Sequence, residues 1–226
     1  MQPYVGRKLP STMESGKLSA SEEAQETMNA AVGISVIEAP PHGMEHVPGP
    51  NKHCAFVGLA RQGRTIWAAS EDINCPIARY VLGCNLTRQR AAEAAAASFV
   101  ESKLAKDFDA ALRFVSGFRA LEPQDRVFVY FPLEAAPLPA DIAVRFLHPE
   151  DAMRRLRALV AATGERAEVR TAGSAAICAD CTAAPLLSGR AAFSPGCPGS
   201  RREVPLAQDE VLVAFPARLE SAVDIG

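Results

Sequence analysis

Two cysteine segments of similar length, one in each half of the chain, constrain the fold most strongly. The first runs from Cys54 to Cys75 and the second from Cys178 to Cys197, so the cysteine separations are 21 and 19 residues. Each segment begins with Cys-Ala, ends with Cys-Pro and contains a Gly-Arg pair. We interpret the two segments as one unit used twice. The chain is therefore expected to fold as two pseudo-repeated half-domains, roughly residues 21–120 and 121–226.

Length, charge and cysteine content narrow the class of protein. A chain of 226 residues buries enough apolar surface to be stable without cross-links. A net charge of −2, with acidic and basic residues mixed, gives no basic patch for nucleic acid. The first thirty residues lack a secretory signal, and no apolar run reaches the roughly 18 residues that span a membrane. We expect a cytoplasmic protein, in which thiols stay reduced and six cysteines indicate metal or redox chemistry.

Apolar periodicity predicts an α/β or α+β domain in which a mixed sheet forms the core and loops carry the cysteines. Residues 1–20 are expected to form a flexible arm ahead of a single domain at 21–226. Strands are predicted at residues 32–37, 64–69, 127–131, 142–147, 167–171 and 210–215. Helices are predicted at 21–31, from Pro76, at 88–115 with a bend near Lys106, and at 149–163 before Gly164. A proline-rich loop should lead to Cys54.

The two longest predicted helices have apolar residues at helical spacing, and we expect these side chains to face the core. In the first helix they include Leu104 and Phe108, and in the second they are Met153, Leu156, Leu159 and Val160.

The cysteines are the strongest candidates for chemistry. Zinc and iron–sulfur clusters both need three or four thiolates at one point, and Cys54, Cys75, Cys178 and Cys197 supply four. Proline after two of them is familiar from ferredoxin-type sequences, where it ends the ligand loop. A zinc ribbon would need two close pairs, yet only Cys178 and Cys181 form a CxxC, and Cys75 and Cys84 are nine residues apart. A thioredoxin-like redox pair is less favoured still, because the CxxC lacks aromatic and proline neighbours.

Three further residues are weaker candidates for catalysis. His53 adjoins Cys54 and would serve as a proton carrier beside a metal, or simply as a polar loop residue. Asp180 is suited either to acid–base catalysis or to stabilising a turn. Arg201 is suited either to binding an anion, such as the sulfides of a cluster, or to a solvated basic turn. Cys84 follows Val-Leu-Gly and is expected in the core. No GxGxxG, phosphate loop, GxSxG or HExxH is present, so no motif assigns a reaction.

Short motifs follow one another in a recognisable order along the chain. They are Lys52 to Gly63, Asn74-Cys75-Pro76, Leu82-Gly83, Asp141 to Val144, Pro149, Thr163-Gly164, Cys178 and Cys197 to Arg201. In this order the chain resembles the uncharacterised family DUF169, and the resemblance covers nearly everything after residue 30. The resemblance implies that the cysteines at 54, 75, 178 and 197 match those of the family, whereas Cys84 and Cys181 do not. Many relatives occur in anaerobic organisms, which suits an oxygen-sensitive cluster. In relatives a glycine often follows the Cys-Pro pair that contains the second of the four cysteines; here that pair is Cys75-Pro76, and Ile77 follows it.

The leading hypothesis is one [4Fe–4S] cluster bound by Cys54, Cys75, Cys178 and Cys197. With four thiolates the cluster suits electron transfer with a redox partner protein, or a structural role. With three, the open iron would act as a Lewis acid on a small-molecule substrate. The alternatives are a zinc-stabilised or metal-free module that binds a ligand or partner, and an accessory protein for metallocentre assembly that uses Cys84 and Cys181. A homo-oligomer whose cysteines meet across the interface also fits the pattern.

Overall fold

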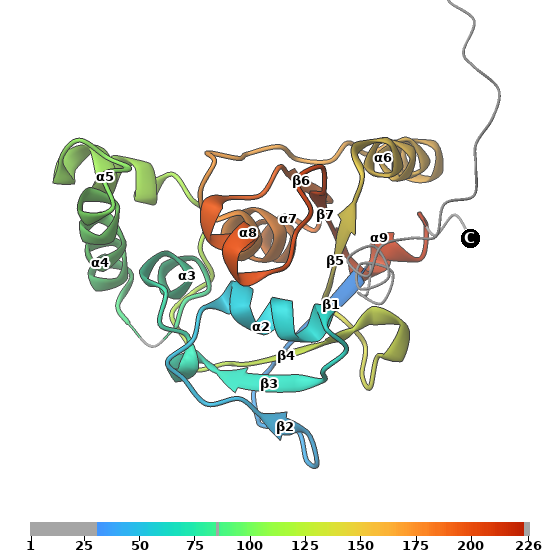
Figure 1. Cartoon of the computed structure of the whole chain (residues 1–226), viewed down its shortest axis with the longest axis horizontal. Helices are drawn as coiled ribbons and strands as arrows, with labels where there is room; N and C mark the ends of the chain where they lie inside the picture. Colours follow the sequence, from blue (N-terminus) through green and yellow to red (C-terminus); the bar gives the residue numbers. More distant parts are fainter. Residues whose placement is uncertain (1–30, 85, 224–226) are drawn as a thin grey trace, which may run out of the picture.

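Seven strands form one mixed sheet in the order β2-β3-β4-β1-β5-β7-β6 (Figure 1). The structure is a computed structural model that describes residues 31–84 and 86–223. Only β2 and β3 pair in parallel, and the other neighbouring strands are antiparallel. The strands are β1 (Ala31–Ile37), β2 (Glu45–His46), β3 (Ile66–Ala69), β4 (Val127–Pro132), β5 (Ile142–Leu147), β6 (Ala192–Ser194) and β7 (Val211–Pro216). The predicted mixture of helices around a mixed sheet is confirmed.

Helices fill the connections between the strands. They are α2 (His53–Arg61), α3 (Pro76–Val81), α4 (Arg88–Glu101), α5 (Phe108–Ser116), α6 (Pro149–Thr163), α7 (Ala184–Ser188), α8 (Pro198–Glu203) and α9 (Ala217–Glu220). A π-helix, η3 (Ala176–Ala183), runs directly into α7, and η1 (Ser70–Asp72) and η2 (Leu133–Ala135) are 3₁₀ turns. No helix in the described part of the chain is long and apolar enough to cross a membrane.

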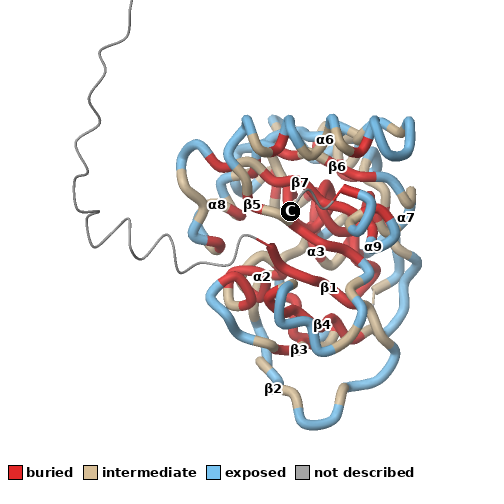
Figure 2. Tube along the Cα trace, turned by 90° about the vertical axis from the view of Figure 1, so that its right-hand side faces the viewer, coloured by how far each residue is buried: buried red, intermediate tan, exposed pale blue. Residues whose placement is uncertain are grey.

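The core lies on both faces of the sheet because side chains alternate along each strand. In β4, Phe128 and Tyr130 join the main core, which contains α2, α3, α4 and η3. Val129 and Phe131 point to the other face, where Trp67 and Leu138 cover them. Helices α6 and α9 cover that second face beside β7. Figure 2 shows the central strands mostly buried, so the sheet is a rigid base for the helices on its main face.

The two sides of the sheet have the same strand order. On one side, β1 lies at the sheet centre, β3 lies outside and β4 lies between them; β5, β6 and β7 repeat this order on the other side. Because β4 belongs to the first set, the boundary between the two sets falls after the predicted one at residue 120. The two central strands pair antiparallel, with Val32 opposite Val144. In both halves the first cysteine precedes the outer strand and the second follows it. Two equivalent half-domains would give this topology, but the duplication itself stays a prediction.

Several predicted elements differ from the structure. Two of the four cysteines are not on loops, since Cys54 lies in α2 and Cys178 lies in η3. Cys75 and Cys197 lie on loops as predicted, immediately before α3 and α8. The region 167–171 is not a strand, because Glu168 makes only an isolated bridge to Ala192. The predicted helix at 88–115 is two helices, α4 and α5, which confirms the predicted break. The predicted arm at 1–20 and nearly all of the helix at 21–31 lie outside the described residues.

Four apolar side chains predicted to face the core are exposed instead. They are Leu104 and Phe108, near the turn between α4 and α5, and Met153 and Val160 on α6. Helix α6 contacts the sheet through one narrow stripe that contains the buried Ala152 and Leu159. Met153 lies about 100° around the helix from Ala152, which turns it away from this stripe.

Candidate functional site

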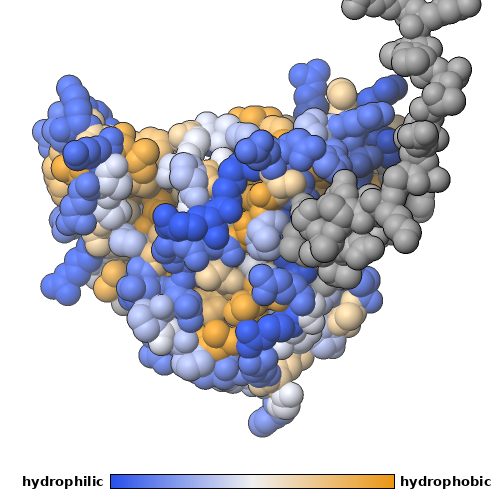
Figure 3. Space-filling view, viewed as in Figure 1, coloured by the Kyte–Doolittle hydropathy of each residue, from blue (hydrophilic) through white to orange (hydrophobic). Residues whose placement is uncertain are grey.

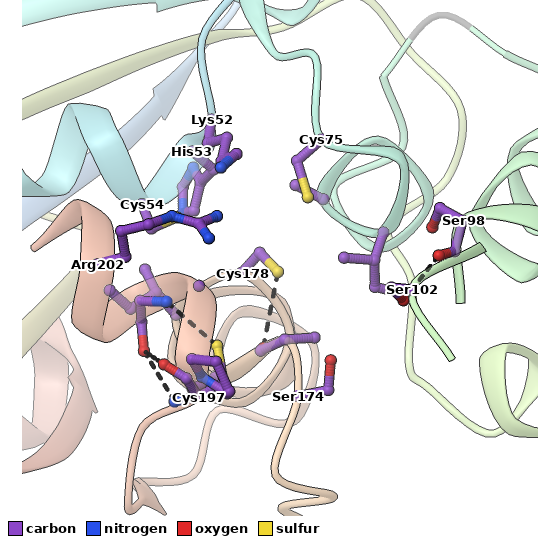
Figure 4. A pocket seen from close by; sticks show the side chains of 18 of the residues that line it. Lys52, His53, Cys54, Cys75, Ser98, Ser102, Ser174, Cys178, Cys197 and Arg202 are labelled. Atoms are coloured by element: carbon purple, nitrogen blue, oxygen red, sulfur yellow. Dashed lines mark hydrogen bonds between the residues drawn. The ribbon is translucent and has the colours of Figure 1, made fainter. Parts of the chain in front are cut away.

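One cavity of about 300 Å³ brings together four cysteines from distant parts of the sequence. Cys54, Cys75, Cys178 and Cys197 all line it. Figure 4 shows them around a single space, with Lys52 and Arg202 on one side and Ser98 and Ser102 on the other. Cys84 and Cys181 are fully buried in the core and do not belong to this lining. The position of Cys84 confirms its predicted place in the core.

Three of the four cavity cysteines lie at the start of a helix. Cys54 is the second residue of α2, whereas Cys75 and Cys197 are the N-caps of α3 and α8. Proline follows each of the two caps because a first-turn residue needs no N–H donor. The Cys197 Sγ accepts a hydrogen bond from the backbone N–H of Ser200 at 3.3 Å. Amides at helix starts favour the negative charge of a thiolate.

The Asp72 carboxylate fixes the turn that precedes Cys75. Asp72 accepts hydrogen bonds from the backbone N–H of Gly49 at 2.6 Å and of Ala69 at 2.8 Å, and it pairs with the His46 ring at 2.9 Å. Burial acts to raise the pKa of Asp72, but the bonds from His46 and the two amides outweigh it and lower the pKa overall. The Asp72 carboxylate therefore ties the loop before α2 to the turn before α3.

The fourth cysteine, Cys178, lies in the π-helix. The residue that precedes this helix, Ala175, has φ of +59°, a left-handed conformation that alanine rarely adopts. The Cys178 thiol points to the Ala175 carbonyl oxygen at 3.6 Å. Single-turn π-helices and strained backbone both occur frequently at functional sites.

The cavity thiols influence one another's ionisation. Burial, and then the neighbouring thiols of Cys75 and Cys197, raise the pKa of Cys54 to about 12. Burial and the other three cavity cysteines raise the pKa of Cys178 well above its usual value. Both groups are therefore neutral thiols at neutral pH, and ionising them requires a positive charge nearby.

The rim of the cavity is basic on one side and apolar on the other. Lys52 and Arg202 share the Glu203 carboxylate, at 2.6 and 3.1 Å from Oε1. The hydrogen bond from Lys52 is the main reason that the pKa of Glu203 is lowered. Phe99 and Leu104 belong to the opposite wall, and Figure 3 shows hydrophobic side chains between the α4–α5 region and α8. Two cations and one carboxylate leave this rim with a net positive charge.

His53 lines the cavity, but the fold already uses both nitrogens of its ring. Nδ1 lies 2.9 Å from the Tyr130 hydroxyl and Nε2 lies 3.0 Å from Thr182 Oγ1. The side chain is 1% exposed, and burial lowers its pKa to about 3. His53 is therefore a neutral bridge between α2, β4 and η3, and this placement favours a structural role over proton transfer.

Asp180 and Arg201, the other two weak candidates, lie outside the cysteine cavity. The Asp180 carboxylate accepts a hydrogen bond from Ser194 at 2.9 Å, and burial raises its pKa to about 6. The Arg201 guanidinium donates to the carbonyl oxygens of Pro195, Ala207 and Glu210. Through these bonds Arg201 holds the segment around Cys197 in place, so it is not part of a solvated basic turn.

A buried ion pair holds α2 against the segment between α8 and β7. Arg61 donates to Glu210 through two bonds of 3.0 and 2.6 Å, and also to the Pro205 carbonyl oxygen at 2.7 Å. Within α2, Gly58 lies so close to α8 that an added Cβ would be 2.5 Å from the Glu203 carbonyl oxygen. The helices that carry Cys54 and Cys197 are thereby fixed relative to each other.

The sequence pattern did not identify these supporting residues. Arg61 was the available signal, because an arginine that directly follows the apolar run from Phe56 to Ala60 needs a partner if it is buried with that run. Across the described residues, no three or more His, Cys, Asp or Glu side chains are arranged to hold a metal ion.

Comparison with known proteins identifies the family. The profile of DUF169, described as an uncharacterised ArCR, matches residues 17–223. This chain belongs to the DUF169 family. The chain is also similar to Uncharacterized protein MJ0308 of Methanocaldococcus jannaschii, with 28% identity over 179 residues, which are 78% of this chain and 76% of that protein. No solved structure matches the chain significantly. The predicted resemblance to DUF169 is thus confirmed, and neither comparison assigns an activity.

Proposed function

We propose that this DUF169 protein binds one [4Fe–4S] cluster through Cys54, Cys75, Cys178 and Cys197. The observation that carries the proposal is that these four cysteines line one cavity although they come from four separate segments. Four thiolates are the ligand set of a fully coordinated cluster. The other two cysteines, Cys84 and Cys181, are buried in the core without lining this cavity. Burial alone therefore does not explain why the four predicted cysteines converge.

The chemistry of the cavity fits a cationic metal core. The raised pKa values of Cys54 and Cys178 mean that these cysteines become thiolates only when a metal supplies positive charge. Four thiolates make a bound cluster anionic overall, and the basic rim of Lys52 and Arg202 offsets that charge. The backbone amides at the starts of α2, α3 and α8 also offset this negative charge.

A fully coordinated cluster supplies one-electron redox chemistry when bound. We therefore propose that the protein transfers electrons in the cytoplasm, to a redox partner protein or to a small molecule, and that oxygen damages its cofactor. The apolar wall of Phe99 and Leu104 favours a second candidate, a module that binds a small apolar molecule without metal. In that case the cysteines would be lining residues only.

Reversible reduction tests the proposed function. Protein purified under nitrogen should have broad visible absorption from sulfide and thiolate bound to iron. Dithionite should bleach this absorption, and a mild oxidant should restore it in repeated cycles. A colourless protein, or a coloured protein whose absorption does not respond to either reagent, would contradict electron transfer.

A further inference from the structure

A second cavity, of about 190 Å³, adjoins the π-helix at Asp180. Cys178 lines the first cavity, and Asp180, two residues later, lines the second. The walls of the second cavity include Phe114 and Phe118, and its lining also contains Arg119 and Arg170. At roughly 30 Å³ for each water molecule, this space has room for about six waters or one small ring.

An open basic trough continues from this second cavity. The two spaces share Phe118 and Arg119 in their linings, and the trough adds Arg88, Arg190 and Glu168. Arg190 is exposed, and the side chains of Arg88 and Arg119 are 47% and 34% exposed. A molecule that enters the second cavity and continues into the trough would therefore extend past several guanidinium groups.

The second cavity and the trough together have more positive charge than their carboxylates neutralise. Arg119 and Arg170 both face the same oxygen of Glu168, Oε2, at 3.4 and 3.7 Å. That oxygen is buried and accepts no hydrogen bond from any described residue. Arg88 pairs with Glu122, whose side chain is 83% exposed. A guanidinium has five N–H donors, so these loosely paired arginines retain donors for an anion.

The second cavity offers an acceptor and two aromatic side chains. Asp180 is 4% exposed, Ser194 donates to its Oδ2 at 2.9 Å, and the Thr171 side chain also forms a hydrogen bond with the carboxylate. A carboxylate has about four acceptor positions, so Asp180 can accept a further hydrogen bond from a ligand. Phe114 and Phe118 have ring centroids 5.0 Å apart and supply apolar contact for a flat ring.

We propose that this second site binds a nucleoside phosphate. The base would lie in the second cavity and donate its amino group to Asp180. The phosphates would lie where the cavity meets the trough, against Arg170 of the cavity, Arg190 of the trough and Arg119, which lines both. This proposal is independent of the cluster, because none of these residues lines the cysteine cavity.

Calorimetric titration of the full chain with ADP, CDP, pyrophosphate and inorganic phosphate tests the second site. At least one nucleotide should bind more tightly than pyrophosphate, and pyrophosphate more tightly than phosphate. Arg119→Ala should weaken nucleotide binding by about tenfold or more, because one charge-assisted contact is lost. The control Arg154→Ala removes an equally charged exposed side chain from α6 and should leave binding unchanged.

A second variant separates the base from the phosphates. Ala172 is exposed and lines the second cavity, so Ala172→Trp should fill this space without disturbing the core. It should abolish the advantage of the nucleotide over pyrophosphate but keep pyrophosphate binding. The proposal is overturned if neither nucleotide binds, if Arg119→Ala behaves like Arg154→Ala, or if Ala172→Trp leaves nucleotide binding intact.

Discussion

Alanine at any one of the four cavity cysteines should lower the iron and sulfide content of anaerobically purified protein severely, to half or less of the unmodified value. Each replacement removes one thiolate from a four-thiolate site, and the exposed iron is then open to solvent and loss. The four variants are Cys54→Ala, Cys75→Ala, Cys178→Ala and Cys197→Ala. Iron and acid-labile sulfide per chain are the measurements.

The chain supplies its own matched controls for this experiment. Cys84→Ala and Cys181→Ala remove the same atom from core positions that are 1% and 0% exposed. Each should lower the free energy of unfolding by about 1 kcal/mol, through a small cavity, and leave the iron content unchanged. Loss of iron at Cys84 or Cys181, with iron retained at Cys54, would show that the ligand assignment is wrong.

Replacing Arg61 by methionine should lower the free energy of unfolding by about 3–5 kcal/mol. The guanidinium is almost fully buried and makes two bonds to Glu210, so its loss leaves a buried carboxylate without its cation. Urea denaturation of the reduced protein, followed by circular dichroism, measures the change.

Arg64→Met is the control for the buried pair. Arg64 pairs with Glu45 at the surface, where both side chains are about half exposed, and its loss should cost at most about 1 kcal/mol. The double variant Arg61→Met/Glu210→Met should recover part of the loss, because apolar side chains then replace both charges. If Arg61→Met costs no more than Arg64→Met, then the ion pair does not hold α2 in place.

Regions with clear local signals were predicted correctly from the sequence. Strand β5 and helix α6 have the predicted limits, because Pro149 starts the helix and Gly164, at φ of +71°, ends it. Pro76 begins α3 as expected. In these segments the apolar pattern and the residues at the ends favour the same structure, so local preference and tertiary packing agree.

Helix α2 was missed because packing overrides local preference there. Gly58 disfavours a helix by about 1 kcal/mol, and four prolines precede the segment. The glycine is present because α8 approaches closely, a contact between residues distant in the sequence. The predicted strand at 167–171 failed for a related reason, since Val169 is 62% exposed and no strand pairs along the segment.

The π-helix has no sequence period by which it could be recognised. It depends on the left-handed Ala175 and on the packing of α7 that follows it. The four cysteines that the repeated sequence pattern selected do line one cavity. The ion pairs around them lie outside that pattern, so only the structure reveals the frame that fixes their positions.

The most direct test of the account is the amount of iron and acid-labile sulfide in protein purified and handled under nitrogen. A [4Fe–4S] cluster bound by Cys54, Cys75, Cys178 and Cys197 of one chain predicts about four of each per chain. The protein must be tested with all of its cysteines reduced and intact. If it then contains zinc, or contains no metal and no sulfide after reconstitution, the account is contradicted.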